Sequence, residues 1–241
     1  MTHIRRILGG TMENIVSATD LQIGYDQRSV LAKIKQFDVK QGDLVSIIGE
    51  SGIGKTTFLK TIANLISPIS GKLKVFGETG ITVRGRIGYI PQRLGLINHE
   101  SVYSNVLQGA VCNEPIWRSI TGLHERKIID NVLEIIDRMK LSEKSDTPVK
   151  KLSGGQQRRV AIARTMAQNP KLILADEFLS ELDDVTAEHV WKIMLNYIKD
   201  TEITLIIVEH NRKRARMAQR CFEMSEGKDG KLPNLMEVTD D

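Results

Sequence analysis

A glycine-rich loop between a predicted strand and a predicted helix constrains this chain more than any other feature of its sequence. The apolar run from Leu44 to Ile48 is followed by Gly49-Glu50-Ser51-Gly52-Ile53-Gly54-Lys55-Thr56, and Lys55 to Leu65 has the pattern of a helix that Pro68 must end nearby. A strand, a glycine loop and a helix in this order open a parallel α/β sheet. We therefore predict an α/β fold built on a parallel sheet.

Two further apolar runs predict more strands of the same sheet. Leu172 to Ala175 and Ile203 to Val208 both lack the polar alternation of a sheet with one exposed face. Around Phe37 and around Leu73, in contrast, apolar and polar residues alternate. These earlier stretches predict a small antiparallel β subdomain within the first eighty residues.

Apolar residues at helical spacing predict two amphipathic helices, one from Ile128 to Met139 and one from Val190 to Ile198. The first lies in a segment from about Arg93 to Leu152 that has no strong strand signal. A length of 241 residues suits one large α/β domain. We expect a single domain over residues 1–241, with a helical subdomain at about residues 93–152 inserted into the α/β core.

Composition excludes several classes of protein. No apolar run reaches the roughly 18 to 20 residues that a membrane-spanning helix needs, so we expect none. The two cysteines, Cys112 and Cys221, are far apart, which indicates neither a disulfide framework nor a zinc site. The net charge of +4 is small for the length and does not predict nucleic-acid binding.

The loop from Gly49 to Thr56 matches the phosphate-binding P-loop pattern in its required context between strand and helix. Small residues let backbone N–H groups turn inward around a phosphate, and the helix N-terminus adds partial positive charge. Lys55 suits the β- and γ-phosphates, and the Thr56 hydroxyl suits Mg²⁺. A glycine-rich turn with a chance lysine is the alternative. The expected nucleotide-binding residues here are Gly49, Glu50, Ser51, Gly52, Ile53, Gly54, Lys55, Thr56 and Thr57.

Two carboxylates, Asp176 and Glu177, end the apolar run that starts at Leu172. In an open α/β sheet, ligands bind beyond the carboxyl ends of the strands, where this pair falls. Asp176 suits the Mg²⁺ shell and Glu177 suits polarising the attacking water. A solvated acidic loop is the alternative.

The segment Leu152-Ser153-Gly154-Gly155-Gln156 precedes a predicted helix that stops at Asn169-Pro170. Ser153 and Gln156 have the spacing of a capping box. A serine and paired glycines at a helix N-terminus also suit a second anion site. The two interpretations are compatible, because one helix start can be capped and also face a phosphate.

The order of these motifs resembles the ATP-binding cassette family, the ATPase subunits of ABC transporters, over nearly the whole chain. The resemblance implies a P-loop NTPase core that hydrolyses ATP with Mg²⁺. It also implies a head-to-tail, ATP-dependent homodimer in which the signature of one subunit faces the γ-phosphate held by Lys55 of the other. The motifs are the P-loop, Gln92, the signature with Ser153, Gly154, Gly155 and Gln156, then Asp176-Glu177, Ser180-Glu181-Leu182-Asp183 and His210.

Four single residues receive roles only from this resemblance. Gln92, otherwise a solvated loop residue, is similar to the glutamine that touches Mg²⁺ or water. His210, otherwise a structural histidine, is similar to the histidine that contacts the γ-phosphate. Tyr25, otherwise a core aromatic, is similar to the residue that stacks on adenine, and Asp183 would lie at the dimer interface.

Part of the insertion resembles the ATPase subunits of phosphonate importers, and generic helix packing is the alternative. Phe178 and Asp184 depart from common prolines of the family, and the chain beyond His210 does not follow that subfamily closely. The resembling stretches are Asn105-Val106-Leu107-Gln108-Gly109, Pro115-Ile116-Trp117-Arg118-Ser119 and Gly122-Leu123.

The resemblance implies further partners and a location. Because we expect no membrane span, the transport pathway would be a separate multispanning permease, served by an extracytoplasmic solute-binding protein. The chain would then lie at the cytoplasmic face of the membrane. Positive charge concentrates after His210, which indicates a solvated helix face or, alternatively, attraction to anionic lipid headgroups. The residues are Arg212, Lys213, Arg214, Arg216 and Arg220.

Two other functions compete with transport. A soluble ABC ATPase acting in assembly or maintenance is the main alternative, although only one P-loop and one signature occur here and no long coiled coil separates them. A stand-alone P-loop kinase would leave the signature and Gln92 without roles.

Overall fold

The structure is a computed structural model that describes residues 14–79, 85–112, 114, 124–180, 182–227 and 231–238. Residues 115–123, which hold the second part of the phosphonate-importer resemblance, lie outside the described residues. So does Glu181 of the motif at 180–183.

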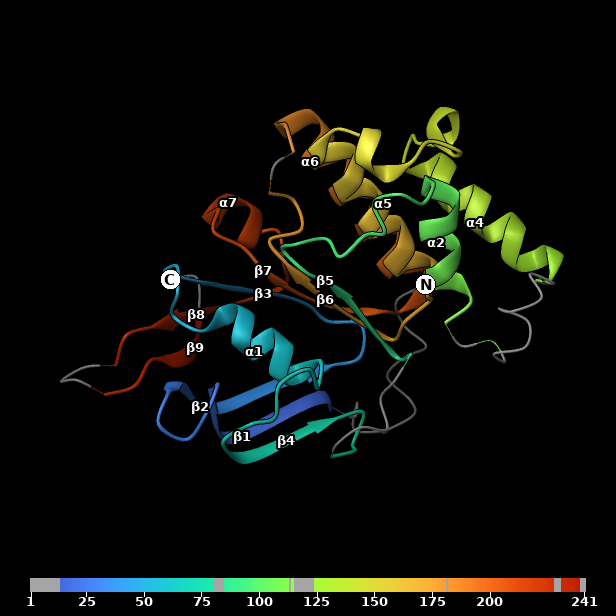
Figure 1. Cartoon of the computed structure of the whole chain (residues 1–241). Helices are drawn as coiled ribbons and strands as arrows, with labels where there is room; N and C mark the ends of the chain where they lie inside the picture. The colour runs from blue at the N-terminus through green and yellow to red at the C-terminus, as the bar shows by residue number, and fades with distance from the viewer. Residues whose placement is uncertain are drawn as a thin grey trace, which may run out of the picture.

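A six-stranded sheet forms the centre of the molecule, in the order β5-β6-β7-β3-β8-β9 (Figure 1). Every neighbouring pair is parallel except β8 with β9, which is antiparallel. The two apolar runs predicted as buried parallel strands are β6 and β7, and all their residues are buried. The strands are β3 (Leu44–Gly49), β5 (Ile87–Ile90), β6 (Leu172–Asp176), β7 (Thr204–Val208), β8 (Arg220–Ser225) and β9 (Asn234–Val238).

A second, three-stranded antiparallel sheet has the order β2-β1-β4, with β1 at Asn14–Gly24, β2 at Val30–Lys40 and β4 at Ser70–Val75. It confirms the antiparallel subdomain expected from the alternating residues. Because apolar and polar side chains alternate along its strands, one face of this sheet packs on the core. There Phe37 packs edge-on against Phe58 and Phe222.

Helix α1 (Lys55–Ile62) lies between the two sheets and buries Phe58, Leu59 and Ile62 (Figure 1). The predicted end at Leu65 is wrong by three residues. Asn64 adopts a left-handed conformation with φ 57°, and the N–H of Leu65 donates to the carbonyl of Lys60. This is the geometry of a Schellman motif, which closes the helix before Leu65 and leaves that side chain exposed.

The other face of the central sheet carries most of the remaining helices (Figure 1). The described part of the segment 93–152 contains helices and two 3₁₀ turns, with no strand. Gly109 permits close helix packing there, because a Cβ at this position would lie 2.0 Å from the carbonyl oxygen of Arg164. The segment holds α2 (Val102–Ala110), α4 (Arg126–Arg138) and the 3₁₀ turns Ser142–Lys144 and Val149–Lys151. The two helices that follow it are α5 (Gly154–Ala167) and α6 (Asp184–Thr201).

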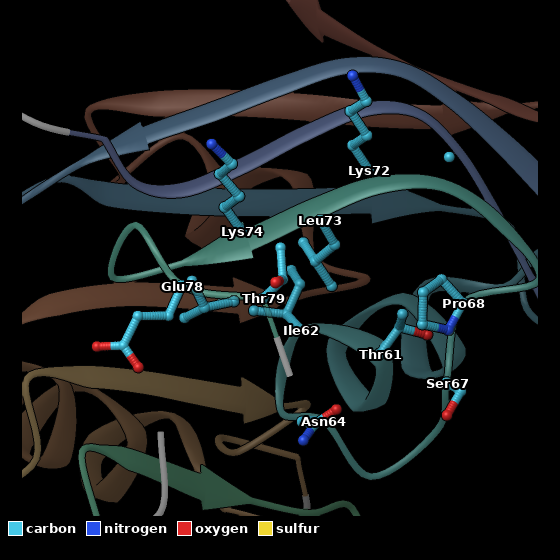
Figure 2. A pocket seen from close by; sticks show the side chains of 12 residues that line it. Thr61, Ile62, Asn64, Ser67, Pro68, Lys72, Leu73, Lys74, Glu78 and Thr79 are labelled. Carbon is cyan, nitrogen blue, oxygen red and sulfur yellow. The ribbon is translucent and has the colours of Figure 1, made fainter. Parts of the chain in front are cut away.

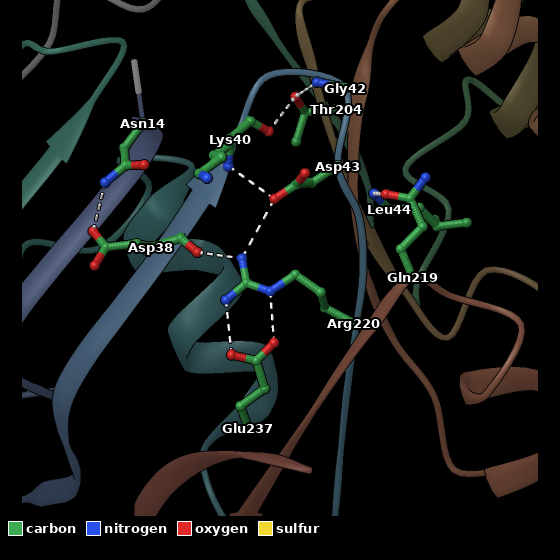
Figure 3. A network of polar contacts seen from close by, with 10 residues as sticks. All are labelled: Asn14, Asp38, Lys40, Gly42, Asp43, Leu44, Thr204, Gln219, Arg220 and Glu237. Carbon is green, nitrogen blue, oxygen red and sulfur yellow. Dashed lines mark hydrogen bonds and ion pairs between the residues drawn. The ribbon is translucent and has the colours of Figure 1, made fainter. Parts of the chain in front are cut away.

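The basic residues after His210 do not share one helix face. Helix α7 is only four residues long, Arg212–Ala215, and Arg220 belongs to β8. Arg220 donates two hydrogen bonds to Glu237 and one to the carbonyl of Asp38, and it also pairs with Asp43 (Figure 3). The expectation of a solvated helix face is therefore wrong for Arg220, which joins the two sheets.

No helix within the described ranges is both long enough and apolar enough to cross a membrane.

Candidate functional site

The predicted P-loop turns sharply between β3 and α1, as its glycines require. Gly49 and Gly54 have φ values of 148° and 114°, in a region that side-chain-bearing residues rarely adopt. A Cβ on Gly49 would also lie 2.3 Å from the carbonyl oxygen of Met224. Gly54 is the N-cap of α1 and no side chain caps it, so the first N–H groups of that helix have no partner within the helix and are available to a ligand.

Lys55 folds its side chain back over this loop. Its ammonium donates to the carbonyl of Gly49 at 2.8 Å and to that of Glu50 at 2.6 Å, and the residue is buried. Burial lowers the pKa of Lys55, while Glu177 and Asp176 act to raise it. The cation is thus held in the concave side of the loop, near two carboxylates.

Thr56 and Asp176 meet across the end of the central sheet. The Thr56 hydroxyl lies 2.9 Å and 3.1 Å from the two carboxylate oxygens of Asp176, which ends β6. Burial raises the pKa of Asp176, and the hydrogen bond from Thr56 lowers it. Thr56 and Asp176 are 120 positions apart in the sequence, and both were predicted to bind Mg²⁺. The structure places them in direct contact.

Glu177 is contacted by both of the other residues predicted for hydrolysis. Gln92 Nε2 donates to its Oε2 at 3.2 Å, and His210 Nε2 lies 2.5 Å from its Oε1. The backbone of Glu177 is left-handed, with φ 52°, and its N–H donates to the carbonyl of Val208. A left-handed non-glycine residue costs of order 1 kcal/mol, so the surrounding contacts must hold Glu177 in this conformation.

The predicted capping box at the start of α5 is confirmed. The Ser153 hydroxyl accepts from the N–H of Gln156, and the Gln156 side chain accepts from the N–H of Ser153. Ser153 and Gly154 are exposed. This helix start is therefore capped and still open to a ligand or another chain.

Tyr25 is 68% exposed and follows β1. The alternative that it is a core aromatic is wrong. Residues on either side of Tyr25 in the sequence lie beside the P-loop. A Cβ on Gly54 would lie 3.7 Å from the side chain of Ile23 and 3.6 Å from that of Leu31. The exposed ring is available for stacking, and its contact with adenine stays a prediction.

Sequence reasoning missed one titratable residue at this site, Glu209. It is 5% exposed, and burial raises its pKa to about 7. The signal was a glutamate that directly continues an apolar strand and precedes His210. A charged residue at the end of a buried apolar strand departs from the pattern of that strand, and it indicates a carboxyl group that is partly or fully buried.

A cavity of about 650 Å³ lies elsewhere, between the end of α1 and β4 (Figure 2). Ile62, Leu73, Lys72 and Lys74 are among the residues that line it. It contains none of the predicted site residues. The candidate site around Lys55 is defined by its converging polar groups.

The residues present fit Mg²⁺. Thr56 and Asp176 offer hydroxyl and carboxylate oxygens side by side, which is the donor type that Mg²⁺ prefers. Within the described ranges, no three His, Cys, Asp or Glu residues cluster as a metal site. Mg²⁺ at nucleotide sites commonly has only one or two protein ligands besides phosphates and water, so such a small set is sufficient.

Comparisons with known proteins agree with this geometry. Residues 32–180 match the family model described as ABC transporter. The chain is 35% identical over 239 residues to a phosphonates import ATP-binding protein of Halalkalibacterium halodurans, covering 94% of this chain and 98% of that one. It is also 35% identical over 215 residues to a hypophosphite import ATP-binding protein of Stutzerimonas stutzeri, covering 85% of this chain and 62% of that one.

A solved structure supports the fold. It is a dimeric, post-hydrolysis ATP-binding cassette bound to ADP and Pi, with a TM-score of 0.74 and 25% identity. The match covers 94% of this chain and 100% of that chain. The family match, the relatives and the fold agree: the chain belongs to the ABC transporter family and is an ATPase that binds adenine nucleotide.

Proposed function

We propose that this chain is the ATP-hydrolysing subunit of an importer for phosphonates or a related phosphorus oxyanion. The observation that carries the hydrolytic part of the proposal is the position of Glu177, which Gln92 and His210 contact directly beside the Thr56–Asp176 pair. The names of the relatives, which include phosphonate and hypophosphite import proteins, support the substrate class.

Binding of ATP would use the backbone N–H groups of the loop from Gly49 to Thr57 and the ammonium of Lys55. In the structure that ammonium donates hydrogen bonds to two backbone carbonyls of the loop, those of Gly49 and Glu50. A phosphate is a stronger partner for a buried cation than a neutral carbonyl, because it carries a full opposite charge that the carbonyl lacks. Lys55 therefore moves from the carbonyls of Gly49 and Glu50 to the β- and γ-phosphates when the nucleotide binds.

Thr56, Asp176 and Gln92 would hold Mg²⁺. The ion supplies charge neutralisation for the β- and γ-phosphates. Asp176 is already ordered by the Thr56 hydroxyl, so both oxygens lie where they are needed. Burial raises the pKa of Asp176, and a cation bound beside it would act in the opposite direction by stabilising the ionised form.

Glu177 is the proposed general base. Both of its carboxylate oxygens have partners in the structure, Gln92 on one and His210 on the other. One of these contacts must open before the carboxylate accepts a proton from the attacking water. His210 would then turn to the γ-phosphate, which couples the presence of that phosphate to the availability of the base.

The exposed start of α5 supports a head-to-tail dimer. Ser153, Gly154, Gly155 and Gln156 would contact the γ-phosphate bound by a second copy, and Tyr25 would stack on adenine. Asp183 accepts from the N–H of Thr186 as the N-cap of α6. It would lie at the interface between the two copies.

A membrane permease and a solute-binding protein are the proposed partners, and they would place the chain at the cytoplasmic face of the membrane. We expect no nucleic-acid partner. The test is to co-express the chain with candidate permeases, purify from membranes, and measure ATP-driven uptake of methylphosphonate, hypophosphite, phosphate and sulfate in proteoliposomes.

We expect a multispanning permease to co-purify and methylphosphonate or hypophosphite uptake to exceed sulfate uptake by at least about tenfold, the effect of ~1.4 kcal/mol in selectivity. Sulfate is the matched control, since it is a tetrahedral oxyanion without phosphorus. Purification only as a soluble assembly without a permease would contradict transport and favour the soluble ATPase. Preferential sulfate uptake would contradict the substrate class alone.

A further inference from the structure

A buried carboxyl group lies directly behind the candidate site and has no role in the proposed hydrolysis. Glu209 Oε1 has no hydrogen-bond partner within the described parts of the chain. The N–H of Glu209 donates to the carbonyl of Ile47, which fixes the residue where β7 ends between β6 and β3. A buried carboxylate oxygen without a partner is unfavourable while the group is ionised, so ionisation of Glu209 favours a cation or another donor moving next to it.

Helix α7 and Glu209 contact consecutive residues of β3, because the Ser46 hydroxyl donates to the carbonyl of Ala215 at 2.9 Å and the N–H of Glu209 donates to that of Ile47. Arg214 of α7 lowers the pKa of Glu209 by its charge, but its hydrogen bond goes elsewhere. Its guanidinium donates to Asp184 Oδ1 at 3.2 Å. The Asp184 side chain is 101% exposed, so water screens this pair and the pair contributes little. Glu209, by contrast, is buried, where a cation gains much more from a carboxylate. Arg214 thus bonds to Asp184, where the interaction stabilises the protein less than it would at the buried Glu209.

Three charged groups act on Glu209 from the elements around it. Burial is the largest influence and raises its pKa to about 7. Arg214 of α7 and His210, the next residue on its own segment, lower the pKa, whereas Glu177 after β6 raises it. Glu209 therefore has a pKa near neutral pH, on which the charges of Arg214 and Glu177 act with opposite sign.

We propose that Arg214 exchanges between Asp184 and Glu209, and that this exchange makes Glu209 a positioning residue for the Glu177–His210 pair. With Arg214 on Asp184, the neutral form of Glu209 is favoured more than when Arg214 binds Glu209. With Arg214 on Glu209, the carboxylate is ionised and adds a negative charge beside His210. The inference rests on the proposed roles of Glu177 and His210.

The position of Asp184 explains what would drive the exchange. Asp184 follows Asp183, the N-cap of α6, which we propose to lie at the dimer interface. Contact of a second copy with this helix start competes for Asp184 and frees Arg214. Dimer formation would in this way change the charge behind the active site before hydrolysis.

The test follows the carboxyl group itself by NMR, in the full chain labelled with ¹³C at glutamate Cδ. The Glu209 signal is assigned as the one missing in Glu209→Gln. We expect Arg214→Gln to raise the pKa of Glu209 by about one pH unit, the low end for loss of one nearby opposite charge. Arg216→Gln removes the same charge from an exposed position after α7, and we expect it to leave this pKa unchanged.

A double-mutant cycle separates exchange from simple electrostatics. We expect Asp184→Asn to lower the pKa of Glu209, because it frees Arg214. In the Arg214→Gln background, the same substitution should have no effect. An equal effect in both backgrounds would overturn the exchange, as would an Arg214→Gln variant in which the pKa of Glu209 is unchanged.

Activity gives an independent readout of positioning. We expect the pH profile of kcat to contain an ionisation that follows the Glu209 midpoint and disappears in Glu209→Gln, with thermal melts confirming that this variant is folded. A pH profile identical to wild type would refute the positioning role. Wild-type turnover in Glu177→Gln would instead refute the proposed base, while the NMR cycle would still decide the exchange.

Discussion

The Arg220 network provides the sharpest test of how the two sheets are held together (Figure 3). Its guanidinium donates to both carboxylate oxygens of Glu237, at 2.6 Å and 2.9 Å, and to the carbonyl of Asp38 at 2.7 Å. A further contact reaches the Asp43 carboxylate at 3.3 Å. We predict that Arg220→Met destabilises the folded chain, because methionine keeps much of the apolar stem but donates none of these hydrogen bonds.

The size of the effect follows from the exposure of the partners. The side chains of Arg220, Glu237 and Asp43 are 29%, 41% and 20% exposed, so each contact is worth less than a fully buried charged hydrogen bond. Taking about 1 kcal/mol for each of the three partners gives a loss of about 3 kcal/mol. For a domain of this size that corresponds to a melting temperature lower by about 6 to 12 °C.

The loss should depend on pH with a definite sign. The hydrogen bonds from Arg220 hold the pKa of Glu237 below its ordinary value. A group whose pKa is lower in the folded state contributes stability above its unfolded pKa and loses it as the pH falls through the folded value. The difference between wild type and Arg220→Met should therefore be full at pH 7 and smaller below about pH 4, since unfolded glutamate titrates near 4.3.

Urea unfolding followed by circular dichroism at several pH values measures this difference. Arg216→Met is the matched control, because Arg216 is exposed, and its replacement should cost less than about 0.5 kcal/mol. If Arg220→Met costs no more than the control, or if its cost is the same at pH 7 and pH 4, the reasoning is refuted.

Three further predictions concern the site and its scaffold. Glu177→Gln should lower kcat for ATP hydrolysis by about 10² to 10⁴ while an ATP-dependent dimer still forms in light scattering, and turnover near wild type would contradict its role as the base. Ser153→Ala should lower the free energy of unfolding by about 1 kcal/mol through loss of the α5 cap, with Ser153→Thr as the conservative control, and an unchanged urea midpoint would count against the cap. Gly109→Ala should destabilise by more than about 1 kcal/mol, because the new Cβ meets the Arg164 carbonyl oxygen at 2.0 Å, and a melting temperature equal to wild type would show that α2 can move away from α5.

The sequence alone was sufficient for the local units of this protein. The apolar run, the glycines and Lys55 together determine a strand, a turn that needs positive φ, and a helix start, because each depends on residues a few positions apart. The same holds for the capping box at Ser153 and Gln156 and for the buried strands β6 and β7. The order of these units along the chain was enough to indicate the family.

Only the tertiary structure decided which distant groups meet. The Thr56–Asp176 contact and the convergence of Gln92 and His210 on Glu177 depend on strand order in the sheet, which periodicity does not encode. The end of α1 depended on Asn64 adopting a left-handed conformation. The raised pKa of Glu209 depended on burial, which Arg214 partly offsets, because a pKa reflects the dielectric and charges supplied by elements far apart in sequence.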